Sequence, residues 1–255
     1  MTTFIVKIRY QEDKMRLILI RHAEPDYSID SLTERGFIEA QALSERISRL
    51  DVKAFYCSPL GRAKKTAEPF LTAMGRSATT LPWLREFSPK VKKPWKEKEG
   101  CAWDWLPEVW CGRENFYDKD SWYSESEFQS ADVKEAYDEV TEGLDALLSS
   151  HGYDRCGGYY RAAKPNRDTI VLVCHFGVMA VMLSHLFGVS PMTLWHGTCA
   201  LPSSVTILDT EERREGIAYF RMNAFGDTSH LYAKGISPSF AARFCETYDS
   251  DERHD

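Results

Sequence analysis

Four apolar residues in a row, at positions 17–20, run directly into Arg21 and His22 with no turn residue between them. A second apolar run, at positions 170–173, leads in the same way into Cys174 and His175. Short, continuous apolar runs followed by helix-like segments are typical of strands buried on both faces of a parallel sheet. Because the carboxyl ends of parallel strands lie at one edge of the sheet, the two histidines are predicted to reach a common site.

Strand-like and helix-like segments alternate along the chain, which favours an α/β fold. Residues 32–50 have apolar positions near helical spacing, and Thr33 is placed to cap that helix. Residues 52–57 predict a second strand, followed by a helix that ends at Gly75. We further expect an edge strand at 4–10, a helix at 131–149 and a hairpin formed by 203–209 and 216–222. These elements predict one domain over residues 1–255, a three-layer α/β/α sandwich around a mostly parallel sheet.

The segment 88–130 differs from the rest because its aromatic residues follow no clear period. It holds five of the seven tryptophans among prolines, lysines and aspartates. We predict a cap or lid insertion over one end of the sheet, in which aromatics together with Lys92, Lys93 or Arg113 wall a substrate pocket. The alternative is a satellite hydrophobic cluster with a purely structural role. The five tryptophans are Trp95, Trp103, Trp105, Trp110 and Trp122.

The composition is that of a soluble protein and narrows the range of partners. A net charge of -6 over 255 residues argues against a general nucleic-acid-binding protein. No apolar run is long enough for a membrane span, and charged residues interrupt the N-terminal segment where a signal peptide would be apolar. Seven cysteines without CxxC spacing favour reduced thiols in a cytoplasmic protein. The sequence gives no indication of a metal site, a cofactor or the oligomeric state.

Arginines and histidines at strand ends form a set of side chains that suits a phosphoryl group. Arg62 follows the strand at 52–57 and lies near the start of the next helix, where free N–H groups also attract anions. A guanidinium matches phosphate oxygens, and a neutral imidazole can attack phosphorus. The leaving oxygen then needs a proton, for which Glu86 is the preferred donor. Glu24, Asp26 and Glu108 are the alternatives.

Five motifs in this order resemble the histidine phosphatase superfamily, which is also called phosphoglycerate-mutase-like. They are RHAE at 21–24, LTERG at 32–36, CSPLGRAKKTA at 57–67, LRE at 84–86 and VCHFG at 173–177. The resemblance implies that His22 is the nucleophile, that Arg21, Arg62 and His175 bind the phosphoryl group, and that Glu86 donates the proton. It also implies the phosphoglycerate-mutase-like fold without a metal ion or cofactor.

Several positions depart from the family pattern. Ala23 replaces a frequent glycine, Lys65 a glutamine, and Phe176 stands between His175 and Gly177. The short loop after His22 favours the phosphatase branch over the mutases. Cys57 and Arg62 are one residue too close for the phosphate loop of a cysteine phosphatase, so Cys57 is predicted to be a buried strand residue.

These motifs predict a metal-independent phosphomonoesterase that acts through a phosphohistidine on a small phosphorylated substrate. A phosphomutase of the same fold and a non-catalytic module that binds phosphate esters are the two alternatives. The sequence does not identify the substrate.

Overall fold

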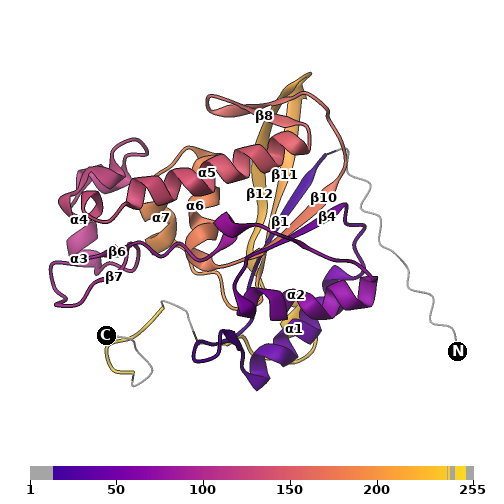
Figure 1. Ribbon diagram of the computed structural model, residues 1–255, viewed down its shortest axis with the longest axis horizontal. Coiled ribbons are helices and arrows are strands. Elements are labelled where there is room, and N and C mark those ends of the chain that lie inside the picture. The colour runs from indigo at the N-terminus through magenta and orange to yellow at the C-terminus, as the bar shows by residue number, and fades with distance from the viewer. Residues whose placement is uncertain (1–13, 240, 242–244, 251–255) are drawn as a thin grey trace, which may run out of the picture.

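The structure, a computed structural model, describes residues 14–239, 241 and 245–250. Its centre is an eight-stranded sheet in the order β5-β4-β10-β1-β11-β12-β9-β8 (Figure 1). Two small hairpins, β2-β3 and β6-β7, lie outside it. The strand predicted at 4–10 is outside the described residues. The strands are β1 (Arg16–Arg21), β2 (Pro25–Asp26), β3 (Ser31–Leu32), β4 (Ala54–Cys57), β5 (Thr79–Thr80), β6 (Lys90–Val91), β7 (Gly100–Cys101), β8 (Tyr153–Cys156), β9 (Tyr159–Ala162), β10 (Thr169–Cys174), β11 (Val205–Arg214) and β12 (Ile217–Asp227).

β1 stands where the sheet changes from parallel to antiparallel pairing. β5, β4, β10 and β1 run parallel to one another, whereas β11 pairs antiparallel to β1 and starts the antiparallel half. In the parallel half the register matches Arg21 with Cys174, and Val173 with Cys57. Three neighbouring strands therefore end at the same level of the sheet.

Helices cover both faces of the sheet, as the continuous apolar runs predict. The helices are α1 (Glu34–Ile47), α2 (Gly61–Met74), α3 (Pro107–Trp110), α4 (Ser126–Gln129), α5 (Val133–Ser150), α6 (Phe176–Phe187), α7 (Pro191–Gly197) and α8 (Ser229–Tyr232). Ile18 and Ile20 of β1 pack in one core with α1 and α2, while Leu17 and Leu19 pack in a second core with α5 and α6. Figure 1 shows these two helix pairs on opposite sides of the sheet. The predicted three-layer α/β fold is confirmed.

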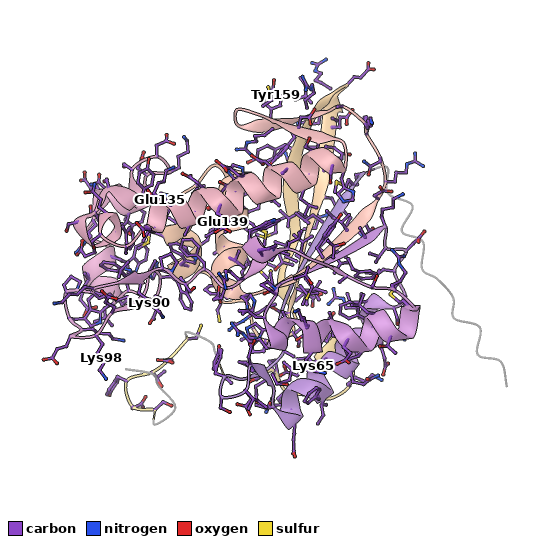
Figure 2. The ribbon with its side chains drawn as sticks, in the orientation of Figure 1. Lys65, Lys90, Lys98, Glu135, Glu139 and Tyr159 are labelled. Atoms are coloured by element: carbon purple, nitrogen blue, oxygen red, sulfur yellow. The ribbon has the colours of Figure 1, made fainter. Side chains whose placement is uncertain are left out.

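Local sequence signals account for the helix ends next to the site. The Thr33 hydroxyl accepts a 3.0 Å hydrogen bond from the Gly36 N–H and caps α1. α2 ends at Gly75, whose φ of 61° is a left-handed conformation that glycine adopts without strain. α5 buries Val133 and Val140 and leaves Glu135 and Glu139 exposed (Figure 2). No helix in the described part of the chain has the length and apolar character needed to cross a membrane.

The segment 88–130 consists of short elements, among them the two-stranded sheet β6-β7. Besides β6, β7, α3 and α4 it contains two 3₁₀ helices, Glu114–Tyr117 and Trp122–Ser124, and a third 3₁₀ helix, Pro82–Leu84, precedes it. Trp105, Phe116 and Trp122 are buried and belong to the same core as α5 and α6. Much of the aromatic content therefore stabilises the segment itself, while Trp103 and Trp110 are only half-buried.

Candidate active site

Three strand ends bring the two predicted histidines together. β4, β10 and β1 are followed by Ser58, His175 and His22. The His22 N–H donates a 3.0 Å hydrogen bond to the Cys174 carbonyl, and the Ser58 N–H donates one of 2.9 Å to the Val173 carbonyl. The sheet pairing thus continues one residue beyond β1 and β4, and the imidazole centroids of His22 and His175 lie 5.0 Å apart.

His22 is buried, with 1% of its surface exposed, and one ring nitrogen is already engaged. Its Nδ1 lies 2.8 Å from the Ala23 carbonyl oxygen, a contact in which Nδ1 carries the proton and donates it. Nε2 is then left with a free electron pair. Burial, followed by the charge of Arg21, lowers the pKa of His22 well below its usual value. The ring is therefore neutral near pH 7.

His175 is fully buried and contacts the hydroxyl of Ser58. Its Nε2 lies 2.7 Å from Ser58 Oγ, which also accepts the Leu60 N–H. Among the described residues, Nδ1 of His175 has no hydrogen-bond partner although it is buried. A buried polar atom of this kind is normally satisfied, so this nitrogen marks a position for a ligand atom. Burial, followed by the charge of His22, lowers the pKa of His175 well below its usual value.

Two guanidinium groups flank the histidines. Arg21 is 3% exposed, its Nη1 donates to the Ala200 carbonyl, and its guanidinium carbon lies 5.8 Å from the centre of the Phe176 ring. Arg62, in the first turn of α2, has a buried Nε without a partner among the described residues. The positive charges of both arginines lower the pKa of His22. The site therefore concentrates positive charge in a protein whose net charge is -6.

Asp30 holds Arg62 in place. Its Oδ1 accepts a 2.7 Å hydrogen bond from Nη1 of Arg62, and its Oδ2 accepts a 2.6 Å bond from the N–H of Gly61. Burial would raise the pKa of Asp30, but these hydrogen bonds outweigh it and hold the pKa below its usual value. A Cβ on Gly61 would lie 2.1 Å from the Asp30 carbonyl oxygen, so this close approach requires glycine. The Tyr27 ring lies 5.4 Å from the Arg62 guanidinium carbon and is 64% exposed, at the outer edge of the site.

The Glu86 carboxyl is bound at the start of α6. Its Oε1 accepts hydrogen bonds from the N–H groups of Phe87 at 2.8 Å and Val178 at 3.1 Å. Burial raises the pKa of Glu86, and these hydrogen bonds and the charges of Arg21 and Arg62 partly oppose that effect. Among the described residues, no hydrogen bond reaches Oε2. This carboxyl is anchored through one oxygen and can exchange a proton through the other.

The three alternative proton donors are engaged or lie elsewhere. Glu24 accepts a 2.8 Å hydrogen bond from the Thr33 hydroxyl and lies 3.5 Å from Nε of Arg35. Asp26 accepts the Ser28 N–H at 3.0 Å, and Glu108 is exposed on α3. Glu86, anchored through Oε1 alone, stays the preferred donor.

Other chemistries find little support in the geometry. Cys57 is a buried strand residue, as predicted, and burial raises the pKa of its thiol to about 12, which disfavours a thiolate. Both nitrogens of His196 are engaged, because Nδ1 lies 2.7 Å from the Met192 carbonyl oxygen and Nε2 accepts the Trp105 N–H at 2.9 Å. Within residues 14–239, 241 and 245–250, no group of three or more His, Cys, Asp or Glu side chains is arranged to hold a metal ion.

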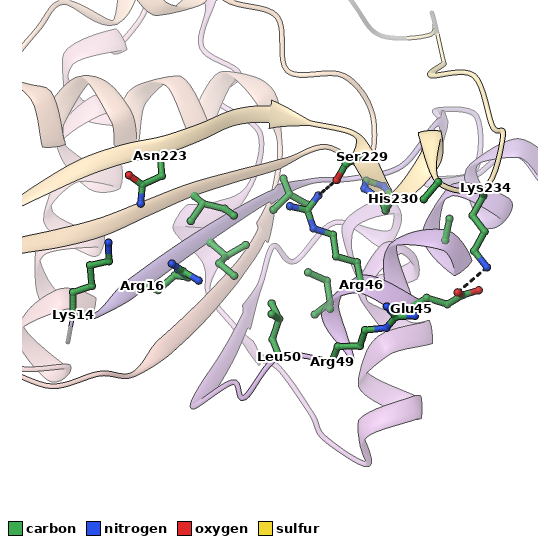
Figure 3. Close-up of a pocket in the computed structure, with 16 residues that line it drawn as sticks. Lys14, Arg16, Glu45, Arg46, Arg49, Leu50, Asn223, Ser229, His230 and Lys234 are labelled. Atoms are coloured by element: carbon green, nitrogen blue, oxygen red, sulfur yellow. Dashed lines mark hydrogen bonds and ion pairs between the residues drawn. The ribbon is translucent and has the colours of Figure 1, made fainter. Parts of the chain in front are cut away.

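A large cavity lies away from these residues. It has a volume of about 870 Å³ and lies between α1, β11 and α8 (Figure 3). Arg46 and Lys234 at its rim are paired with Asp227 and Glu45. None of the five predicted site residues lines it.

All five predicted residues, His22, Glu86, Arg21, Arg62 and His175, thus converge on one site. Asp30 and Ser58 were given no role from the sequence, and Trp103 was named only as one of the five tryptophans of residues 88–130. Ser58 stands in the CSPLGR motif and could have been found from its position one residue after a strand. Asp30 and Trp103 join the site through contacts with residues far away in the sequence, for which a single chain offers no local signal.

Comparisons with known proteins agree with this geometry. A family model described as histidine phosphatase superfamily (branch 1) matches residues 17–223. A probable phosphatase of Schizosaccharomyces pombe is 24% identical over 241 residues, which cover 85% of this chain and 95% of that protein. Phosphoserine phosphatase 1 of Hydrogenobacter thermophilus is 28% identical over 221 residues, 80% of this chain and 90% of that protein.

A solved structure shares the fold. Phosphoserine phosphatase of Entamoeba histolytica, in complex with 3-phosphoglyceric acid, matches with a TM-score of 0.55 and 19% identity over 85% of this chain and 99% of that one. The family model extends across more than half of the chain and includes β4, β5, β10 and residues 17–21 of β1. The chain belongs to the histidine phosphatase superfamily, branch 1.

Proposed function

We propose that this protein is a phosphomonoesterase that transfers a phosphoryl group first to His22 and then to water. The observation that carries the proposal is the state of the His22 ring. Nδ1 is held by the Ala23 carbonyl, the ring is neutral, and Nε2 keeps its electron pair close to two guanidinium groups. A neutral imidazole beside fixed positive charge is suited to attack phosphorus and to form a phosphohistidine.

In the first step, Nε2 of His22 attacks phosphorus while the bond to the alcohol oxygen breaks. The guanidinium groups of Arg21 and Arg62 hold the equatorial oxygens. His175 donates from Nδ1 when the Ser58 hydroxyl donates to its Nε2, a tautomer that fits the 2.7 Å contact between them. Glu86, whose pKa is raised by burial, gives its proton to the departing alcohol oxygen.

In the second step, water attacks phosphorus and the N–P bond to His22 breaks. The Glu86 carboxylate formed in the first step takes the proton from that water, so both groups return to their starting states. Inorganic phosphate then leaves. The charge on the phosphoryl group is met throughout by Arg21, Arg62 and His175, and no step requires a metal ion or a cofactor.

The relatives support a small phosphorylated substrate. The protein from Hydrogenobacter thermophilus is named for phosphoserine, and the structure from Entamoeba histolytica holds 3-phosphoglyceric acid. His22 and His175 are almost completely buried, which fits an opening that admits a phosphate ester of limited size. We propose in addition that residues 88–130 act as a cap beside this opening.

The test is phosphate release from an aryl phosphate in the presence of a chelator. We expect turnover by the wild type, loss of turnover in His22→Ala, and a ³²P-phosphoprotein that survives an alkaline quench but not acid. His151→Ala is the matched control, because His151 is half-buried at the end of α5, outside the site. Full activity of His22→Ala would refute the assignment of His22 as the nucleophile. Binding without turnover or phosphoprotein would favour a non-catalytic module, and faster isomerisation than hydrolysis of phosphoglycerate would favour a mutase.

A further inference from the structure

A second cavity, of about 460 Å³, lies on the side of the site where Glu86, the proposed proton donor, is placed. We call it the tryptophan pocket. Its lining residues include Trp103, Trp105, Trp110, Trp195, His196 and Cys199.

Two walls of the tryptophan pocket touch the catalytic groups. A Cβ on Gly177 would lie 2.6 Å from Oε1 of Glu86 and 2.7 Å from Nε1 of Trp103, so the carboxyl and the indole meet over that glycine. Nε1 of Trp195 donates a 3.0 Å hydrogen bond to the Gly177 carbonyl. On the other side, Arg21 donates to the carbonyl of Ala200, the residue after Cys199.

This placement fits the path of the leaving group. A general acid must reach the oxygen that departs, so the alcohol part of the substrate lies on the side of Glu86. Trp103 covers that side and contacts the Phe176 ring edge to face, with centroids 6.1 Å apart. An alcohol part that extends from Glu86 along Trp103 would reach the tryptophan pocket.

The pocket offers aromatic faces and no cation. The Trp110 and His196 rings stack with centroids 4.8 Å apart and an angle of 24°. His196 acts as an uncharged ring because both nitrogens are engaged, and burial lowers its pKa to about 4. Among the described residues that line the pocket there is no lysine or arginine, whereas Asp104 and Glu246 carry carboxylates.

The cationic side chains that the sequence predicted for the pocket wall, those of Lys92, Lys93 and Arg113, do not line the tryptophan pocket. The ammonium group of Lys93 is buried and donates to the carbonyl oxygens of Trp103 and Asp104. Arg113 pairs with Glu125 and Glu127 at 3.1 and 2.9 Å. Lys92 is exposed, and none of these three side chains lines the tryptophan pocket. A carboxylate or second phosphate on the alcohol part would meet no cationic side chain among the described residues that line this pocket, which is costly.

We infer that the preferred substrate is a phosphomonoester whose alcohol part is apolar or aromatic and carries no anionic group. The inference rests on the proposed function, since it assigns the leaving group of that reaction. Planar alcohols gain from contact with the aromatic side chains that line the pocket, Trp110 among them, and anionic alcohols lose hydration without gaining an ion pair from the described lining residues. Trp110 is therefore a residue that determines specificity.

The experiment compares kcat/KM for 2-naphthyl, 4-carboxyphenyl and methyl phosphate. We expect the naphthyl ester to exceed the carboxylated ester by about tenfold or more, because the carboxylate stays unpaired. Trp110→Ala should lower the ratio of naphthyl to methyl phosphate by about tenfold. Tyr123→Ala should leave that ratio unchanged, because Tyr123 lies in the same segment but does not line the pocket.

The outcomes separate the inference from the function on which it rests. Hydrolysis of all three esters with similar kcat/KM, or preference for the carboxylated ester, would overturn the inference and leave the phosphatase intact. An unchanged ratio in Trp110→Ala would overturn the role of the pocket. Absence of both hydrolysis and phosphohistidine would overturn the proposed function and the inference together.

Discussion

Replacing Gly177 by alanine tests the coupling between Glu86 and Trp103. The new Cβ would lie 2.6 Å from Glu86 Oε1 and 2.7 Å from Trp103 Nε1, whereas ordinary contact begins at 3.4 Å. Each group therefore has to move by about 0.7 Å, and a misplacement of about 1 Å can cost about 100-fold in rate. We expect kcat/KM for an alkyl phosphate to fall by about 100-fold.

The loss should depend on the leaving group. An alkoxide needs the proton of Glu86, whereas 4-nitrophenolate departs without it, so kcat/KM for 4-nitrophenyl phosphate should fall by less than about tenfold. The parameter kcat/KM reports only the steps up to formation of the phosphohistidine. Hydrolysis of the phosphohistidine therefore does not enter the comparison. Glu86→Gln should reproduce the same pattern by deleting the acid directly.

The control is Gly112→Ala, because no heavy atom lies within 4 Å of a Cβ at that position. Its kinetics should match the wild type with both substrates. Equal losses with both substrates in Gly177→Ala would refute the assignment of Glu86 as the displaced acid. Wild-type kinetics in Gly177→Ala would refute the tight contact itself.

Three other expectations concern pH, the phosphate clamp and stability. Because burial raises the pKa of Glu86, kcat/KM for an alkyl phosphate should fall on the alkaline side as this acid deprotonates, and Glu86→Gln should abolish that limb. Asp30→Ala should raise KM about tenfold with a smaller effect on kcat, because Arg62 loses the 2.7 Å contact that orients it; steady-state kinetics measure this, and an unchanged KM would contradict it. Glu39 is buried and its pKa is raised from 4.5 to about 7, so the folded state holds a proton that the unfolded state releases across this window, and stability falls as pH rises. Denaturant unfolding measures the free energy of unfolding of Glu39→Gln and of the wild type. The free energy of the variant minus that of the wild type should increase by about 3 kcal/mol between pH 4.5 and 8. A difference that does not change with pH would disprove the raised pKa of Glu39.

In the parallel half of the sheet, β1, β4 and β10 were predictable, whereas the short, exposed β5 was not predicted. The centre of a strand such as β1 is buried and apolar at residues 17–20, and this leaves a clear signal in the sequence. The cap of α1 at Thr33 and the end of α2 at Gly75 were predictable for a similar reason, since the residue type itself satisfies the helix end. The expected hairpin is confirmed as β11 and β12, and the expected helix at 131–149 as α5.

The antiparallel edge of the sheet was missed. β8 and β9 form a hairpin at Tyr153–Cys156 and Tyr159–Ala162, where exposed and polar residues hide the pattern. Gly157 and Gly158 are the turn signal that could have revealed it, and Gly157 has a φ of 59°.

The motifs predicted the residues around the phosphoryl group but not the groups that orient them. Asp30 reaches Arg62 because its own backbone adopts a left-handed φ of 47°, which sequence spacing does not indicate. The lining of the tryptophan pocket depends on which side of each aromatic ring faces the cavity. Residues 88–130 have no period from which to derive that direction, and the cap role of this segment stays a prediction.

The adjacency of β1 and β10 has a consequence for amide exchange. His22 and His175 follow paired strands, so their separation is set by the spacing of the sheet and by the hydrogen bond from the His22 N–H to Cys174. Breaking that pairing means opening the centre of the sheet, so these amides should exchange with deuterium only on global unfolding. The amides in the short elements of residues 90–129 should exchange through local openings that require less free energy. The phosphoryl chemistry then belongs to the most protected part of the molecule, and substrate selection to a part that can open while the reacting groups stay in place.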